Sequence, residues 1–323
     1  MSCQEDQLLR TPTTYTYKTV GGCQVKADVY RQSVGSTPTA AIIYIHGGCL
    51  IYGSRNGINQ KQLGLYLGAG YAVVSIDYRL APESKLPEII EDLRDAFRWV
   101  RASGPDLCSL DPQRIAVVGD SAGGYLALMS GFCVVPHPQA VVSFYGYGNV
   151  VGEWYTKPDP FYCTQPEVSE EESGRLSMGP VISEPYEGRG KDKFYLYCRQ
   201  RGLWPREVGG HDPENEPSFF TPYCPIQNVS PDYPPTLLLH GDQDTDVPYE
   251  ESVLMAEELA RHQVKHELIT MPQRGHGFDS DMDDSLVRDA FNKVLSFLHR
   301  HTRNMDIDQP DVQQMWPTRR TVL

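Results

Sequence analysis

The sequence has 323 residues, 40% of them hydrophobic and 22% charged, which is the composition of a soluble globular protein with a substantial core. The formal net charge of −13, without a cluster of lysine and arginine, argues against nucleic acid or an anionic membrane as a partner. The acidic first residues lack a signal-peptide pattern, and no apolar run could span a bilayer. Eight scattered cysteines without a C-x-x-C pair favour free thiols, so we expect a cytoplasmic protein.

The first part of the chain alternates between predicted strands and helices. Two runs rich in Thr, Tyr and Val, 13–20 and 23–30, are separated by two glycines and predict a β-hairpin. Continuous apolar runs at 40–45 and 71–76 predict strands buried on both faces, with a helix between them. From 86 to 100 the apolar residues recur at helical spacing, with acids early and bases late, which predicts a second helix.

The next strand leads directly into a sharp glycine-rich turn. The β-branched run 115–118 precedes Gly119-Asp120-Ser121-Ala122-Gly123, and a helix-forming run, 125–129, follows. A G-x-S-x-G pattern between a strand and a helix is typical of a nucleophile elbow, in which the serine lies on a strained turn above the sheet. Side chains at the two flanking glycines would crowd that turn. We therefore interpret Ser121 as a nucleophile rather than as part of a flexible loop.

The alternation stops after a strand at 140–145 and resumes at 236. The intervening segment is rich in proline and aromatic residues, which predicts an inserted cap rather than a second full domain. The pattern as a whole predicts an α/β fold with a mostly parallel central sheet and helices on both faces. The expected organisation is a core at 1–145 and 235–301, a cap at 146–234 and a polar, mobile tail at 302–323, with late strands at 236–240 and 266–271 and late helices at 249–262 and 286–298.

A serine nucleophile needs a base that takes its proton and an acid that orients this base. His276 lies between glycines directly after the last predicted strand, which favours it as the base. Three acids follow the strand before it, and we favour Asp244 as the orienting carboxylate, with Asp246 as the alternative and Asp242 as a brace of the turn. The order serine, acid, histidine is the one expected on this fold.

A second glycine-rich loop follows the strand at 40–45. His46-Gly47-Gly48-Cys49 resembles loops whose backbone N–H groups stabilise a developing oxyanion. We expect Gly48, Cys49 and the elbow residue Ala122 to supply these donors, and His46 to shape the loop. A plain turn is the alternative.

Together these motifs resemble the α/β-hydrolase superfamily, and within it the hormone-sensitive-lipase-like and feruloyl-esterase-like (BD-FAE) carboxylesterases. The shared stretches are H-G-G-C-L-I-Y-G at 46–53, D-Y-R-L-A-P-E at 77–83, G-D-S-A-G-G at 119–124, G-x-x-D-x-x-V-P at 241–248 and G-H-G-F at 275–278. The resemblance implies that Ser121 is the nucleophile, His276 the general base and acid, and Asp244 the orienting carboxylate. It also implies bracing roles for Asp77, Arg79 and Glu83. One departure is Cys49, which replaces the family's third loop glycine and adds a side chain next to the acyl site.

These observations predict a serine esterase that cleaves a carboxylic ester of a relatively apolar, small-molecule substrate through an acyl-enzyme. Two alternatives stay open. The same triad could act on a thioester, a lactone or a carbon–carbon bond, or assist a cyclisation, in a natural-product pathway, or the fold could serve a non-catalytic ligand-binding protein. We expect no cofactor, no metal site, no nucleic acid and no membrane insertion, and a homodimer is compatible with the sequence.

Overall fold

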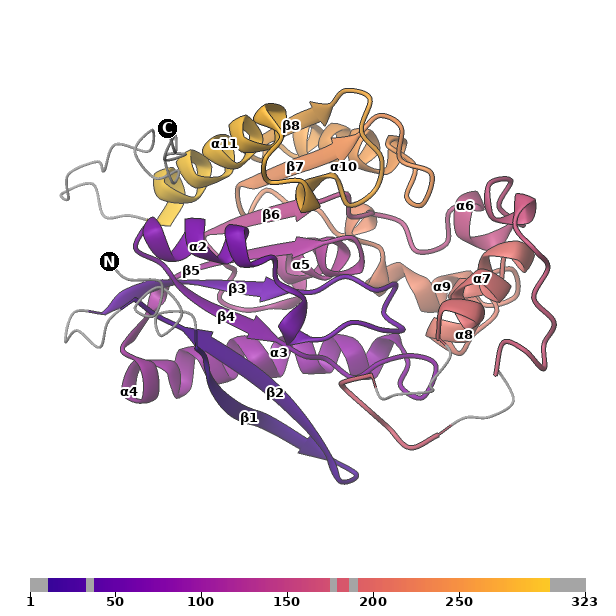
Figure 1. Ribbon diagram of the computed structural model, residues 1–323, viewed down its shortest axis with the longest axis horizontal. Coiled ribbons are helices and arrows are strands. Elements are labelled where there is room, and N and C mark those ends of the chain that lie inside the picture. The colour runs from indigo at the N-terminus through magenta and orange to yellow at the C-terminus, as the bar shows by residue number, and fades with distance from the viewer. Residues whose placement is uncertain (1–10, 33–37, 175–178, 186–190, 303–323) are drawn as a thin grey trace, which may run out of the picture.

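The computed structural model describes residues 11–32, 38–174, 179–185 and 191–302, which form one sheet of eight strands covered by helices (Figure 1). The strands are β1 Thr13–Val20, β2 Cys23–Tyr30, β3 Thr39–Ile45, β4 Ala72–Ile76, β5 Leu110–Asp120, β6 Ala140–Phe144, β7 Thr236–Gly241 and β8 His266–Met271. Across the sheet they lie in the order β1-β2-β4-β3-β5-β6-β7-β8. The hairpin β1–β2 joins β4 antiparallel, and β4 to β8 pair in parallel. The predicted α/β fold is confirmed.

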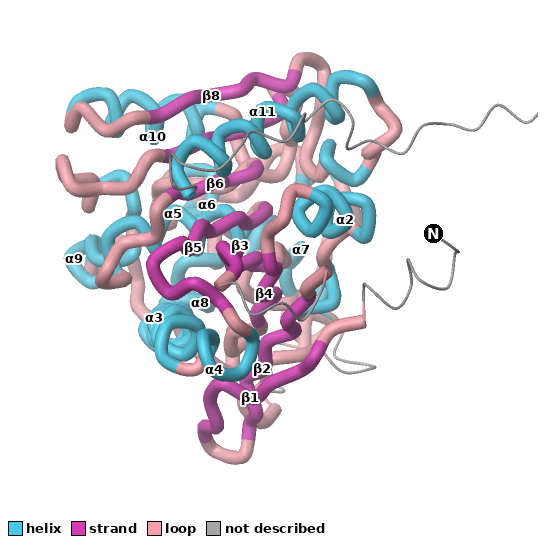
Figure 2. The backbone as a smooth tube through the Cα atoms, turned by 90° about the vertical axis from the view of Figure 1, so that its left-hand side faces the viewer, coloured by secondary structure: helices cyan, strands magenta, loops and turns pink. Residues whose placement is uncertain are grey.

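Helices cover both faces of this sheet (Figure 2). They are η1 Arg55–Gly57, α2 Gln60–Gly68, α3 Leu86–Ala102, α4 Gly104–Cys108, α5 Ala122–Cys133, α10 Glu250–Arg261, η5 Phe278–Ser280 and α11 Ser285–Thr302. Apolar side chains of α2 and α11 share one buried cluster, and those of α3, α5 and α10 share another. Because side chains of a strand alternate between faces, β3 sends Ile42 and Tyr44 into the first cluster and Ile43 and Ile45 into the second.

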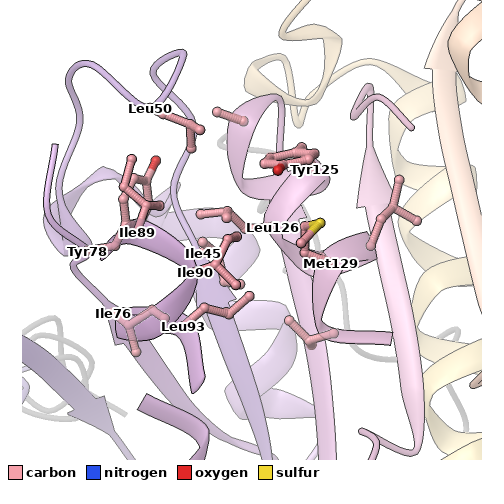
Figure 3. Close-up of a cluster of buried hydrophobic side chains, with 14 of the residues drawn as sticks. Ile45, Leu50, Ile76, Tyr78, Ile89, Ile90, Leu93, Tyr125, Leu126 and Met129 are labelled. Atoms are coloured by element: carbon pink, nitrogen blue, oxygen red, sulfur yellow. The ribbon is translucent and has the colours of Figure 1, made fainter. Parts of the chain in front are cut away.

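The packing of α3 and α5 fixes the part of the sheet that carries the elbow. Figure 3 shows Ile89, Ile90 and Leu93 of α3 in one cluster with Leu126 and Met129 of α5. All five side chains are at most 1% exposed. Burial of one such side chain stabilises the fold by about 1.5–3 kcal/mol, so this contact holds α5, and with it the elbow, firmly against the sheet.

The strand order reverses direction at β3. The chain leaves β3 through α2 to reach β4 on one side, and then returns through α3 to β5 on the other side. Loops after two strands that diverge in this way leave a crevice at the carboxyl edge of the sheet. The glycine-rich loop after β3 and the elbow after β5 meet at this crevice.

Residues 146–234 connect β6 to β7, and we name them the β6–β7 insertion. Its helices are α6 Glu153–Thr156, η2 Tyr162–Thr164, α7 Lys191–Arg201, α8 Trp204–Gly209, α9 Pro217–Phe220, η3 Thr221–Tyr223 and η4 Pro225–Gln227. Of these, α6, α7 and α8 lie beyond the carboxyl ends of the parallel strands (Figure 1). Part of the insertion returns to the hairpin, where Ser183 donates to the carbonyl of Gln24 at 2.9 Å and Glu184 pairs with Lys26 at 2.9 Å.

The strand and helix predictions differ from the structure mainly at element ends. Strand β5 begins at Leu110, earlier than the predicted run, because Leu110 pairs with Thr39 of β3. The polar residues 111–114 that follow have no apolar signal. Helix α4 was not predicted, since its five residues are too few to show a periodicity. The tail was predicted at 302–323, but Thr302 is the last residue of α11 and is 1% exposed; the remainder of the predicted tail lies outside the described residues. No helix in the described ranges is both long and apolar enough to cross a membrane.

Candidate active site

Ser121 occupies the apex of the turn between β5 and α5. Its backbone angles, φ 54° and ψ −119°, lie in a region that L-residues rarely adopt, and its N–H donates to the carbonyl of Phe144 at 2.9 Å. A Cβ on Gly119 would lie 2.1 Å from the carbonyl oxygen of Gly123, and one on Gly123 would lie 2.0 Å from that of Ile45. These close approaches explain the glycines of the motif.

The structure brings His276 and Asp244 into line with this serine. His276 Nε2 lies 3.0 Å from Ser121 Oγ, and His276 Nδ1 lies 2.7 Å from Asp244 Oδ2. The proton on Nδ1 is held by the carboxylate, so Nε2 is left as an acceptor for the serine hydroxyl. Residues 155 positions apart in the sequence thus form one continuous chain of hydrogen bonds.

The side chain of Asp244 is fully buried and held from several sides. Its Oδ1 accepts from the N–H groups of Asp246 at 2.8 Å and Val247 at 3.0 Å, and its Oδ2 also lies 3.2 Å from His240 Nε2. Burial alone would raise the pKa of this carboxyl, but the hydrogen bonds from His240 and His276 outweigh it and lower the pKa far below its usual range. Asp244 is therefore an anion at neutral pH.

His276 rests against the ring of Tyr145, whose centroid is 4.5 Å away. Burial would lower the pKa of this histidine, but the hydrogen bond with Asp244 and the nearby charges of Asp246 and Asp120 raise it overall. Tyr145 itself has a positive φ of 38° and donates to Asp279. Sequence reasoning missed Tyr145, although its place directly after β6 was a usable signal.

The loop after β3 curls tightly next to the elbow. Gly48, Cys49 and Leu50 all have positive φ, at 108°, 57° and 61°, and the carbonyl of Gly48 accepts from the N–H groups of Ile51 and Tyr52. Within the part of the chain that the structure describes, the N–H groups of Gly48 and Cys49 donate to no carbonyl. Ala122 opens α5, so its N–H has no partner earlier in the helix. In the described part of the chain, none of the three predicted donors is thus used in a backbone hydrogen bond of its own.

His46 and Asp120 both contact Gly47 and help to hold this loop. The ring of His46 stacks on Tyr78 at 4.3 Å, and burial lowers its pKa to about 4, which keeps it neutral. Asp120 accepts from the hydroxyl of Tyr44 at 2.5 Å and from the N–H of Gly47 at 3.2 Å. Burial and the neighbouring carboxyl of Asp279 raise the pKa of Asp120 to about 6.

Cys49, the departure from the family motif, is 3% exposed, and its thiol donates to the hydroxyl of Tyr52 at 3.5 Å. Burial and the nearby charge of Asp246 raise the pKa of the thiol well above its usual range. A protonated, buried thiol is a poor nucleophile, which leaves that role to Ser121.

Two side chains of the β6–β7 insertion fix the loops of the site. The indole Nε1 of Trp204, a fully buried residue, donates to the carbonyl of Cys49 at 3.0 Å. The guanidinium of Arg199, 1% exposed, contacts Asp246 Oδ1 at 2.8 Å and Asp159 at 2.5 Å. Sequence reasoning missed both residues, because the insertion has no periodicity that orients its side chains.

The other two acids after β7 have different surroundings. Asp242 is exposed and accepts from the N–H of Gln273 at 2.6 Å, which agrees with a role in bracing the turn. Asp246 lies close to the histidine but on the other ring nitrogen, 3.6 Å from Nε2. It is therefore not placed to orient the ring through Nδ1.

A cavity of about 330 Å³ opens above Ser121 and His276. Its walls include Tyr44, Tyr52 and Asp246 as well as the glycine-rich loop. Many aromatic rings of the insertion are packed elsewhere, among them Tyr155, Phe194 and Phe220, which are at most 2% exposed. The aromatic composition of the insertion thus reflects largely its own core, and the predicted apolar substrate loses that support.

The charged D-Y-R-L-A-P-E stretch braces the fold outside the cavity. Arg55 pairs with Asp77 at 2.6 Å, and Arg79 pairs with Asp92 at 2.7 Å, so the partners come from other elements. Glu91, Asp92 and Asp95 are close enough to hold a metal ion, but the ammonium of Lys18 contacts each of them within 2.8 Å. That ammonium fills the place an ion would take.

Comparisons with known proteins match this chain to hydrolase families. The BD-FAE family profile matches residues 27–153, and the profile of the prolyl oligopeptidase family matches residues 195–305. The chain is 29% identical to esterase LipC of Mycobacterium tuberculosis over 86% of its own length and 62% of that protein. It is 28% identical to the non-reducing polyketide synthase Preu6 of Preussia isomera over 88% of its own length, but spans only 14% of that synthase.

The fold is also found among solved structures. An alpha/beta hydrolase superfamily protein from Enterococcus faecalis superposes with a TM-score of 0.68 and 20% identity, over 90% of this chain and 99% of that one. The predicted resemblance is therefore confirmed: the chain is similar to the BD-FAE family over residues 27–153 and to the prolyl oligopeptidase family over residues 195–305, and it shares the fold of the alpha/beta hydrolase superfamily protein.

Proposed function

We propose that this chain is a serine hydrolase that cleaves a carboxylic ester through an acyl-enzyme on Ser121. The observation that carries the proposal is the pair of hydrogen bonds from Ser121 to His276 and from His276 to Asp244, at 3.0 and 2.7 Å. Ester hydrolysis is also what the name of the relative LipC implies for that protein.

In the first half of the reaction, Ser121 Oγ attacks the ester carbon while His276 Nε2 takes the hydroxyl proton. The carbonyl oxygen becomes an oxyanion, which the N–H groups of Gly48, Cys49 and Ala122 stabilise. His276, now an imidazolium held by Asp244, gives its proton to the leaving alcohol oxygen as the carbon–oxygen bond breaks. Water then repeats the sequence on the acyl-enzyme and frees the acid, with Ser121 restored.

We further propose that the β6–β7 insertion acts as a cap on a core formed by residues 1–145 and 235–301. Its support is the contact of Trp204 with the loop at Cys49 and of Arg199 with the loop at Asp246. For the acyl part of the substrate we keep the expectation of an apolar group, supported by the tyrosine rings and Cys49 that line the cavity.

Substitution of Ser121 by alanine tests the nucleophile. We expect turnover of p-nitrophenyl butyrate to fall by about 10⁴-fold or more, and covalent labelling by a fluorophosphonate probe to disappear. Ser280→Ala, which removes an exposed hydroxyl near the histidine loop, should retain both. Labelling of the Ser121→Ala protein at the wild-type level would overturn the proposal.

A second candidate is a thioester, lactone or carbon–carbon bond hydrolase, or a cyclase, with the same triad. The matches to polyketide synthases favour it, since these enzymes are built for natural-product synthesis. The same labelling experiment separates the candidates: a labelled enzyme that cleaves butyryl-N-acetylcysteamine but not p-nitrophenyl butyrate would favour the thioester. An enzyme that neither labels nor turns over would favour the ligand-binding alternative.

A further inference from the structure

Asp246 is held in one orientation by the β6–β7 insertion. Its Oδ1 accepts hydrogen bonds from the hydroxyl of Tyr162 at 2.9 Å, the hydroxyl of Tyr195 at 2.6 Å and the guanidinium of Arg199 at 2.8 Å. Three donors on one carboxylate oxygen leave little capacity on that atom and fix the plane of the group. The direction of the other oxygen is therefore set before any substrate arrives.

That other oxygen lies at the reaction centre. Asp246 Oδ2 is 3.6 Å from His276 Nε2, and Asp246 lines the cavity above Ser121. Within the described ranges of the chain, Oδ2 accepts no hydrogen bond. The side chain of Asp246 is 17% exposed at the cavity wall, so a bound molecule can reach this oxygen and donate a hydrogen bond to it.

The net charge around Asp246 also favours a hydrogen-bond donor, rather than an anionic group, at Oδ2. Arg199 is shared between Asp159 and Asp246, so this group of three side chains carries one negative charge in excess. The cavity wall at Oδ2 thus attracts the positive end of an O–H dipole and repels an anionic group.

The position of Oδ2 indicates which part of the substrate it meets. His276 Nε2 is the atom that hands its proton to the oxygen of the leaving alcohol, so a group next to Nε2 lies beside the alcohol part of the ester. We propose that the site takes esters of polyols, whose alcohol carries a free hydroxyl on the carbon next to the esterified one, and that Asp246 Oδ2 accepts the hydrogen bond from this hydroxyl. This inference rests on the proposed ester hydrolysis and names its substrate class.

A matched pair of substrates tests the proposal. In 2-hydroxyethyl butyrate the neighbouring hydroxyl can donate, whereas in 2-methoxyethyl butyrate a methyl group replaces the proton and the rest is the same. Since a hydrogen bond to a charged acceptor contributes about 1.5–3 kcal/mol, the wild-type enzyme should favour the hydroxyl ester in kcat/KM by about tenfold or more. A wild-type ratio near one would overturn the inference, even if both esters are cleaved.

Asp246→Asn is the informative variant. Its amide oxygen must stay with the three donors on the Oδ1 side, so its NH₂ group replaces Oδ2 and turns an acceptor into a donor. The preference for the hydroxyl ester should fall to about one. Loss of activity on both esters by the same factor would instead assign Asp246 a purely electrostatic effect on His276 and would overturn the inference.

Asp242→Asn is the matched control, because it makes the same change on the same loop at an exposed residue that does not line the cavity. It should retain the wild-type preference. Labelling of Ser121 by the fluorophosphonate probe, measured in all three proteins, separates the two proposals. An unlabelled wild-type enzyme that cleaves neither ester refutes the hydrolase, whereas a labelled enzyme without preference refutes only the substrate class.

Discussion

At the scale of single residues, the candidate chemistry depends on how His276 is surrounded. Each nitrogen of its ring faces a carboxylate, Asp244 on Nδ1 at 2.7 Å and Asp246 near Nε2 at 3.6 Å. Both charges favour the protonated ring, and together with Asp120 they outweigh the burial that would disfavour it. The histidine must be neutral to accept the serine proton, so these neighbours set the pH at which the reaction can begin.

The effect of pH on the Asp244→Asn variant follows from this balance. Wild-type kcat/KM should rise with pH through the pKa of His276, which lies above the ordinary value of 6.5. The amide removes the charge and the hydrogen bond that raise this pKa, so the midpoint should move to lower pH. Turnover at the plateau should fall by about 10⁴-fold, because the ring is no longer held in the correct tautomer. A full pH profile checks both, and an unchanged midpoint would contradict the assignment.

The residues of the site differ in how far the sequence could predict them. Ser121, Asp244 and His276 each follow a strand within a recognisable motif, and parallel strands carry such residues to one edge of the sheet. The choice between Asp244 and Asp246 could not be settled from order alone, because two residues apart on a curled loop they face different nitrogens of one ring. Arg199 and Trp204 had no sequence signal, since only the folded insertion places them at the site.

At the scale of elements, two loops of the candidate site contact the β6–β7 insertion. The loop after β3 contains three successive positive φ angles, which cost energy in any non-glycine residue and persist only when neighbours hold them. Trp204 supplies one such contact through its indole N–H, and its ring stacks on Tyr155 at 4.1 Å. The insertion therefore helps to keep the loop with the proposed oxyanion donors in place.

Trp204→Phe should weaken this support while it keeps an aromatic ring at the position. Loss of the hydrogen bond to the carbonyl of Cys49 should lower the free energy of unfolding by about 1–3 kcal/mol. With the donors at Gly48 and Cys49 less fixed, kcat should fall while KM changes little. Trp99→Phe, at a ring that packs on Tyr15 away from the site, is the control for the loss of an indole. Equal kcat values in the two variants would show that Trp204 does not support the loop.

At the scale of the whole molecule, the sheet order was open to prediction only in part. Buried apolar runs identified the parallel strands. The antiparallel pairing of β2 with β4 could not be predicted, because it depends on which edge of the sheet is left free once the parallel strands have paired.

A buried carboxyl also joins the β6–β7 insertion to the core. Glu251, 6% exposed on α10, accepts from the N–H groups of Gly148 and Asn149 at the start of the insertion.

This carboxyl should make stability depend on pH. Burial raises the pKa of Glu251 from 4.5 to about 7, so between these values the folded protein binds more protons than the unfolded chain. The contribution of Glu251 to stability is then present at low pH and is lost as the pH rises to about 7 and beyond. Glu251→Gln cannot ionise, so relative to wild type its free energy of unfolding should gain about 1–3 kcal/mol between pH 5 and pH 8. Urea denaturation at the two pH values checks this, and a constant difference would contradict it.

The contacts of Trp204 and Arg199 with the loops of the candidate site have a consequence for protein engineering. If the proposed function holds, an exchange of the β6–β7 insertion that removes both contacts should lower turnover even on substrates that the new insertion accommodates. We therefore expect an exchanged insertion to change rate as well as specificity. Libraries that exchange this insertion should therefore keep Trp204 and Arg199 unchanged.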